Sequence, residues 1–191
     1  MFSHKRWAVT FLLMALLLVG SACSLAAEDK LELASIDREL IEMAKNDQDA
    51  RKNHNLTDML RVDKLNLIRL KEIIKQYGWP DSKRFSKDAS AGAWLILQHA
   101  SHDGVFQKEG LELMKQIKGG GVHPVHIAYL EDRVSLFENE VQIYGTQGYC
   151  VGSKFVLSPV KNEKDINLRR ENAKLPPIEA YIEEASNKLC N

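Results

Sequence analysis

The chain has 191 residues and a mass of 21.7 kDa, the length of one ordinary domain or of one domain with a processed segment. Hydrophobic residues make up 45% and charged residues 27%, a globular composition that excludes a wholly disordered chain. The formal net charge is zero and the pI is about 7.0. Because no basic excess is available to attract phosphate backbones, nucleic-acid binding is excluded as a partner class.

The first 27 residues have the pattern of a secretory signal peptide. Lys5 and Arg6 precede an uncharged, mostly apolar run over residues 8–20, and small residues follow it. A transmembrane helix needs about 20 apolar residues, so the run is short for one, and an uncleaved anchor is the alternative. We therefore expect a single exported domain over residues 28–191, in the periplasm or the outer envelope.

Two ways of cutting this segment stay open. Ordinary signal peptidase could recognise residues 24–26 or residues 25–27 and leave a start near Glu28. Alternatively, residues 20–23 resemble a bacterial lipobox, in which Cys23 would be lipidated and become the first residue, although Gly20 replaces the usual leucine. In that case the lipid anchor would be the expected contact with a membrane.

The body of the chain contains two cysteines, Cys150 and Cys190. In an oxidising compartment they could form one disulfide, which would close a loop of about 41 residues and contribute roughly 3–4 kcal/mol. The alternative is a pair of free thiols that do not meet.

Hydrophobic periodicity predicts a mainly helical domain. Apolar residues recur every three to four positions, the spacing of amphipathic helices, and a nearly all-apolar segment at 88–103 predicts a buried helix. Gly78 and Pro80 end one helix, and Pro124 begins another after three glycines. The predicted helices cover residues 31–51, 56–77, 88–103, 105–118, 124–138, 165–174 and 177–189.

The periodicity changes after residue 140. Residues 141–144 alternate between apolar and polar, residues 154–157 are also strand-like, and glycines lie between them. We expect a short antiparallel hairpin near residues 141–158. The predicted fold class is therefore mainly α, a helical bundle-like domain with one small β-hairpin.

Polar residues interrupt several apolar stripes. Asp63 is the only polar position in the stripe of helix 56–77, Asp47 continues the stripe of the preceding helix, and Asp132 interrupts the stripe after Pro124. A buried charge without a partner costs several kcal/mol, so such residues are paired, bind a metal or line a cleft. We expect one shared polar site formed by Asp47, Asp63, His99, Asp132 and Arg133.

Two simpler explanations compete with a shared site. The stripes could end or rotate and leave the acids in solvent, or Arg51 and Arg133 could pair with the acids in a structural ion network.

Histidine spacing also suggests a zinc site, because His99, His102 and Asp103 share a helical face and His123 and His126 repeat the spacing. No His-Glu-x-x-His, paired-cysteine or Glu-x-x-His motif accompanies them, so we predict no metal site and leave any cofactor unidentified.

Several short motifs together resemble a bacterial domain family of unknown function. The motifs are YGWP (77–80), WLILQHA (94–100), AYLEDR (128–133), QIYGTQ (142–147) and LPPIEAY (175–181). Their joint order is specific, and the resemblance covers about residues 47–182. Members of that family often have Asp at the position of Ser101 and Gly at the position of Lys174. The departure at Ser101 would put an activity in doubt if that position were catalytic.

The resemblance implies a shared fold and a shared polar set but no established activity. This polar set comprises Asp47, Asp63, Asn66, Gln98, His99, Asp132, Arg133, Tyr144, Thr146 and Gln147.

Two functions remain open at this stage. The first is an exported hydrolase that acts on envelope or extracellular material, with His99 as general acid or base and Asp132 or Asp63 orienting it. Arg133 would bind an anionic group of the substrate. Further substrate contacts are expected from Gln98, Asp47, Asn66, Tyr144 and Gln147. The second is a non-enzymatic ligand-binding or envelope-interaction module in which the polar cluster is structural.

Overall fold

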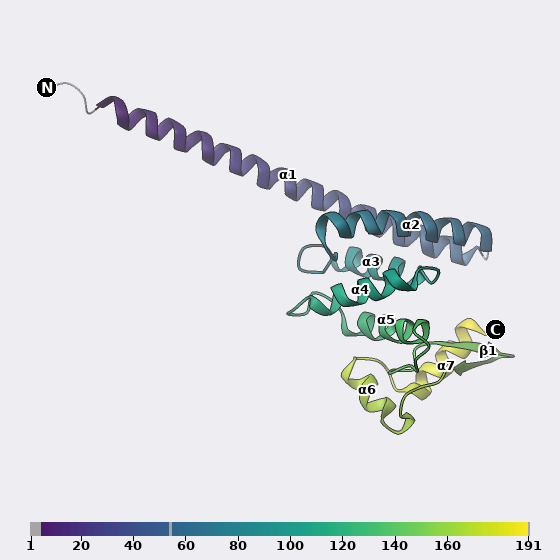
Figure 1. Cartoon of the computed structure of the whole chain (residues 1–191). Coiled ribbons are helices and arrows are strands. Elements are labelled where there is room, and N and C mark those ends of the chain that lie inside the picture. The colour runs from purple at the N-terminus through teal and green to yellow at the C-terminus, as the bar shows by residue number, and fades with distance from the viewer. Residues whose placement is uncertain (1–4, 54, 191) are drawn as a thin grey trace.

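The structure is a computed structural model that describes residues 5–53 and 55–190, with side chains described from residue 28 onward. It is mainly helical with one two-stranded antiparallel sheet, which confirms the predicted fold class (Figure 1). The helices are α1 (Lys5–Lys52), α2 (Leu56–Tyr77), α3 (Lys87–His99), α4 (Gly104–Gln116), α5 (Pro124–Phe137), α6 (Ile166–Asn172) and α7 (Ile178–Leu189). The strands are β1 (Gly148–Val151) and β2 (Lys154–Leu157), and a 3-10 turn covers Glu163–Asp165.

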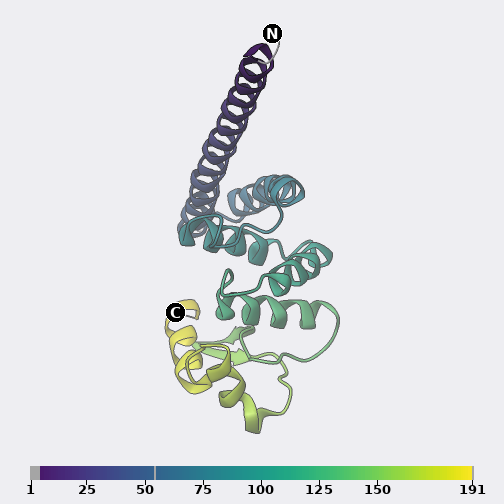
Figure 2. The same ribbon diagram turned by 90° about the vertical axis from the view of Figure 1, so that its left-hand side faces the viewer.

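The helices are stacked in chain order around one main core. The first part of α1 extends beyond the other elements, and its second part packs against α2 and α3 (Figures 1 and 2). Helices α3, α4 and α5 pack on one another, and α7 packs on β2. The main core contains Leu40, Leu70, Ile73, Leu97, Met114 and Leu130, each at most 1% exposed.

Helices α1 and α3 approach each other closely at Gly92. A Cβ atom at this position would lie 2.8 Å from the backbone oxygen of Leu40 and 3.1 Å from the Cβ of Ala44. Real Cβ atoms almost never come that close to a backbone atom, so the contact requires glycine. This close packing holds the last turns of α1 beside the last turn of α3, which is where the site lies.

Two helix ends differ from the prediction by more than two residues. Helix α3 ends at His99 and not at residue 103, because the Asp103 side chain accepts a hydrogen bond from the Phe106 backbone N–H and begins α4. The first helix begins at Lys5 and not at residue 31. Helix α2 matches the predicted range 56–77, but Leu56 and Leu60 are exposed, so its buried face is rotated from the predicted stripe.

The hairpin lies within the predicted region but pairs different segments. Strand β1 pairs with β2 from Gly148↔Leu157 to Val151↔Lys154. The predicted strand 141–144 is wrong, since Gln142 forms only an isolated parallel bridge with Val160. Its side-chain amide instead donates to the backbone oxygens of Gln147 and Ser158, so this segment is a loop held by a buried side chain.

The predicted signal segment falls largely outside what the structure describes. Residues 1–4 are not described, and for residues 5–27 only the helical backbone is, so the Cys23 side chain lies outside the described residues. Within the described part of the chain, no helix has the length and apolar character required to cross a membrane. The signal peptide and its cleavage site stay predictions.

The predicted disulfide is present. The Cys150 and Cys190 sulfur atoms are bonded at 2.06 Å, with Cα atoms 5.5 Å apart. The bond joins β1 to the residue that follows α7, and the Ser186 hydroxyl of α7 accepts a hydrogen bond from the Phe155 backbone N–H of β2. The hairpin is thus fixed to the last helix by both covalent and polar contacts.

Candidate functional site

The polar residues that the sequence analysis grouped together form two clusters. The first, which we call the His99 cluster, consists of Asp47, Arg51, Asp63 and His99. The second, which we call the Asp132 cluster, consists of Asp132, Gln142, Tyr144, Thr146 and Gln147. The two clusters differ in the groups that donate hydrogen bonds to their carboxylates.

The His99 cluster is assembled from three helices. Asp47 and Arg51 lie one turn apart on α1, Asp63 comes from α2, and His99 is the last residue of α3. The His99 Nδ1 atom lies 2.9 Å from each carboxylate oxygen of Asp47. Arg51 Nη2 donates to Asp47 at 3.1 Å and to Asp63 at 2.7 Å, and Arg51 Nε lies 3.0 Å from His99 Nδ1.

Burial decreases from the centre of this cluster to its edge. The Asp47 side chain is 1% exposed, Asp63 11%, His99 17% and Arg51 24%. Solvent therefore reaches the imidazole and the guanidinium but not the carboxylate behind them. A buried acid with a partly exposed histidine in front of it is the arrangement in which an acid orients an imidazole for proton transfer.

The Nδ1 atom of His99 has two partners that require opposite tautomers. With a proton on Nδ1 the ring donates to Asp47, and Nε2 is left as a free base. Without it, Nδ1 accepts from Arg51 Nε–H, and a neutral ring carries its proton on Nε2. Both tautomers have a partner within this cluster, and the form with its proton on Nδ1 leaves the Nε2 lone pair free.

Asp47 is held as a carboxylate. Burial alone would raise its pKa, but hydrogen bonds from His99 and Gln48 and the charges of His99 and Arg51 outweigh it, so the pKa is lowered. A negative Asp47 keeps a proton on Nδ1 and stabilises the imidazolium. Asp47 therefore takes the orienting position that the sequence analysis gave to Asp132 or Asp63.

Asp47, Asp63 and His99 also offer ligand atoms within 4.8 Å of one another, close enough to share a metal ion. Arg51 donates to both carboxylates and faces the imidazole, so a protein side chain supplies positive charge there. The other histidines considered for zinc lie elsewhere: His126 stacks on Trp94, and the His123 side chain caps α5.

Asp132 has a different environment from the one expected. It is fully buried, and its carboxylate accepts hydrogen bonds from the backbone N–H groups of Ile143, Tyr144 and Thr146 and from the Thr146 hydroxyl, at 2.7–3.0 Å. Burial raises its pKa even though these hydrogen bonds favour the charged form. The structure thus corrects the expectation that Asp132 faces His99, because all its hydrogen bonds fix the 143–146 loop to α5.

The remaining predicted residues are mostly structural in their contacts. Asn66 donates to the Met43 backbone oxygen and ties α2 to α1. The Tyr144 hydroxyl donates to Glu131, and the Gln147 side chain donates to the Thr146 hydroxyl within the Asp132 cluster. Gln98 is buried, and its side-chain oxygen has no hydrogen-bond partner among the described residues.

Arg133 is the predicted residue that most resembles a ligand contact. Its Nε atom is buried without a hydrogen-bond partner, and no ion pair to it is found within residues 28–53 and 55–190. Burial lowers the pKa of Arg133, the nearby hydroxyls of Tyr181 and Tyr129 raise it, and the charge of Arg51 lowers it. The Arg133 guanidinium is therefore a partly buried cation whose charge is not balanced by an ion pair within the described residues.

Two arginines were not included in the predicted site. Arg51 follows Asp47 by four residues, and the sequence analysis considered it only as a partner of the acids in a structural ion network; it does pair with Asp47 and Asp63. Arg170 is fully buried, donates to the backbone oxygens of Tyr144 and Pro176, and lies over the Tyr181 ring at 4.8 Å. Hydrophobic periodicity did not indicate Arg170, because α6 is too short to show a stripe.

Fold and site together define a mainly helical, disulfide-linked domain with an Asp–His pair beside two arginines. The chain belongs to the DUF6624 family, a family of unknown function, whose model matches residues 29–188. This confirms membership in a family of unknown function, and the match begins just after the predicted signal segment. No curated protein and no solved structure matches the chain significantly.

Lys174, where the sequence analysis noted glycine in relatives, has a φ of 62°, a region that favours glycine.

Proposed function

We propose that this protein is a hydrolase that uses His99 as its general base and acid. The observation that carries the proposal is the Asp47–His99 contact, in which a buried carboxylate holds Nδ1 of a partly exposed imidazole. No hydrogen bond to His99 Nε2 is found among the described residues, so this nitrogen is available to a water molecule. Histidine is the side chain that most often acts as a general acid or base in catalysis.

The proposed reaction needs only water and the side chains of the site. Water attacks the electrophilic atom of the substrate while its proton moves to His99 Nε2. The bond to the leaving group then breaks, and Nε2 returns the proton to that group. Asp47 stabilises the imidazolium between the two transfers, and Arg51 and Arg133 balance negative charge on the substrate.

We further propose that the protein acts outside the cytoplasm of a bacterium, on envelope or extracellular material. The basic start and apolar run of residues 1–27 support export, with or without a lipid on Cys23. The Cys150–Cys190 disulfide supports it independently, because disulfides persist mainly in oxidising compartments.

The test is turnover of a panel of chromogenic esters, amides, phosphate esters and glycosides by the purified full chain. We expect one class to be hydrolysed, and His99→Gln to lower kcat by about 10²–10⁴-fold. The matched control is His102→Gln, an exposed histidine three residues away, which should leave kcat unchanged. Absence of turnover across the panel, or equal rates in both variants, would contradict the proposal.

A binding module without enzymatic activity is the second candidate. Arg51 favours it, because one guanidinium pairs with Asp47 and Asp63 and faces His99, as in a structural ion network. Under this alternative, His99→Gln lowers the free energy of unfolding and changes no activity. Urea unfolding of the same two histidine variants therefore separates the two candidates.

A further inference from the structure

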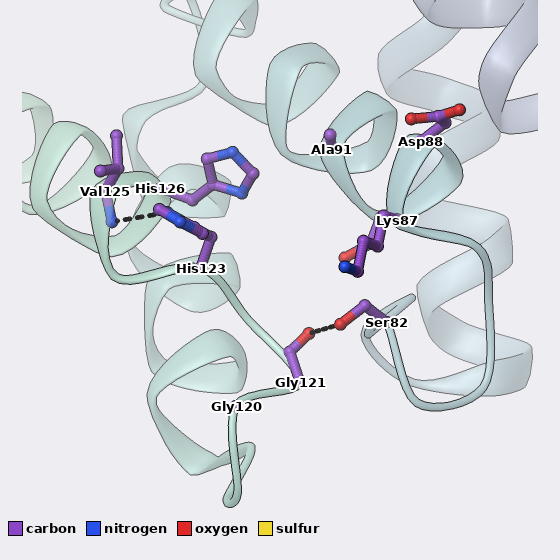
Figure 3. A pocket seen from close by; sticks show the side chains of 10 residues that line it. Ser82, Lys87, Asp88, Ala91, Gly120, Gly121, His123, Val125 and His126 are labelled. Carbon is purple, nitrogen blue, oxygen red and sulfur yellow. Dashed lines mark hydrogen bonds between the residues drawn. The ribbon is translucent and has the colours of Figure 1, made fainter. Parts of the chain in front are cut away.

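A cavity lies at the opposite end of α3 from the His99 cluster. Its volume is about 570 Å³, and its walls come from the loop before α3, the first turns of α3, the glycine turn and the start of α5 (Figure 3). Lys87 and His99 are the first and last residues of α3, so the two sites are separated by about 18 Å along the helix. The cavity is thus independent of the proposed hydrolytic site.

The cavity contains polar side chains that lack partners. Lys87 is exposed, no hydrogen bond or ion pair to it occurs within the described part of the chain, and Figure 3 shows the end of its side chain near Ser82. Ser90 is only 6% exposed, lines the cavity, and makes no side-chain hydrogen bond to any described residue. The Ser90 hydroxyl is not among the fully buried polar atoms without a partner, so its oxygen is accessible from the cavity and can donate to a ligand there.

His126 forms a flat wall of the cavity. Its ring stacks on Trp94 with centroids 4.1 Å apart and planes 9° from parallel. Burial, together with the charge of His123, lowers the pKa of His126 to about 4, so the ring is neutral at physiological pH. A neutral imidazole still carries one N–H, which can donate to a ligand.

The charge of the cavity favours an anion. Asp88 is the acid among the lining residues, and Figure 3 shows its carboxylate pointing away from His123 and His126. Lys87 places a cation in the cavity, which disfavours a metal ion. Helices α3 and α5 both begin at the cavity, and the partial positive charge of helix N-termini adds to the charge of Lys87.

We propose that this cavity binds a small molecule through a phosphate or carboxylate group. Lys87 neutralises the anion, and the Ser90 hydroxyl and the His126 N–H donate hydrogen bonds to it. The volume lies within the usual range of small-molecule sites, about 300–1,000 Å³, so the anionic group can carry an organic remainder.

The test is calorimetric titration of the full chain with inorganic phosphate and, separately, with succinate. We expect saturable binding of at least one, accompanied by a shift of the His126 ring resonances in NMR. Lys87→Gln should weaken binding by about tenfold or more, and Ser90→Ala by about three- to tenfold. The matched control, Lys118→Gln, removes an exposed lysine that precedes the glycine turn but does not line the cavity, and should bind normally.

Each outcome decides the proposal. Binding of phosphate alone or of succinate alone, when Lys87→Gln weakens it, supports the site and identifies the group it takes. Failure of both anions to bind overturns the site, as does binding that Lys87→Gln and Ser90→Ala leave unchanged. Ser90→Ala removes only one oxygen, so it tests the site even if another variant fails to fold. Because His99→Gln should leave anion affinity unchanged, this test and that of the proposed hydrolase fail separately.

Discussion

The His99 and Asp132 clusters contain similar residue types, but different kinds of group donate hydrogen bonds to their carboxylates. The Asp132 carboxylate is surrounded by backbone N–H groups of one loop and is fully buried. In the His99 cluster, the acids are hydrogen-bonded by side chains, and the imidazole and guanidinium reach solvent. Backbone donors cannot titrate or leave, whereas side-chain donors can exchange their partners for a ligand. The first cluster is suited to hold a loop, and the second to handle protons.

The largest expected effect comes from removing the Asp132 carboxylate. Asp132→Ala leaves three backbone N–H groups and the Thr146 hydroxyl without their acceptor, and should lower the free energy of unfolding by about 3–5 kcal/mol. Urea denaturation measures the loss. Asp49→Ala, which removes a half-exposed acid with lysine partners, should change stability by less than about 0.5 kcal/mol. A loss below about 1 kcal/mol in Asp132→Ala would break the contrast between the clusters.

A smaller effect is expected where α1 and α3 meet. Gly92→Ala places a methyl group against the Leu40 backbone oxygen, so the helices that carry Asp47 and His99 must separate. The cost should be about 1–3 kcal/mol by chemical denaturation, and the His99 ring resonances should shift in NMR. Asp88→Ala on the exposed side of α3 is the control. If Gly92→Ala leaves these resonances in place, the close approach of the helices does not set the geometry of the His99 cluster.

The smallest effect is the pH dependence, which should have opposite signs in the two clusters. Because the pKa of Asp47 is lowered from 3.8, its contribution to stability is present above that value and is lost as the pH falls through the folded-state pKa. Because burial raises the pKa of Asp132, its ionisation weakens folding as the pH rises above 3.8. Urea unfolding of wild type, Asp47→Asn and Asp132→Asn between about pH 2.5 and 6.5 measures both slopes. If the free energy of unfolding changes with pH in the same way in all three proteins, the two carboxylates do not differ in the direction of their pKa shifts.

Much of the fold could be predicted because hydrophobic spacing reflects packing directly. The range 56–77 was correct, since Asn55 and Gly78 mark its ends with a side-chain cap and a positive φ. The predicted helix 88–103 was too long, because hydrophobic periodicity does not show whether Asp103 lies inside that helix or caps the next one. The alternation at 141–144 also misled, since a buried glutamine side chain replaced strand pairing there.

The candidate site could be predicted only in part. Interrupted stripes identified Asp47, Asp63 and His99, which do meet, because a buried charge must find a partner. The interrupted stripe at Asp132 has a different cause, because backbone N–H groups of a loop donate hydrogen bonds to its carboxylate. Backbone N–H groups cannot be recognised from a sequence pattern. The cavity beside Lys87 was not predicted, because its walls are mostly loops and helix starts without periodicity.

The position of the disulfide constrains when the domain can be completed. Cys150 lies in β1, and its partner Cys190 follows 40 residues later, after α7 (Figure 1). Because synthesis proceeds from the N-terminus, helices α1–α5 can assemble around their own core before the Cys150–Cys190 disulfide of the hairpin forms. If the chain is exported unfolded, the disulfide can close only after Cys190 as well as Cys150 has crossed the membrane.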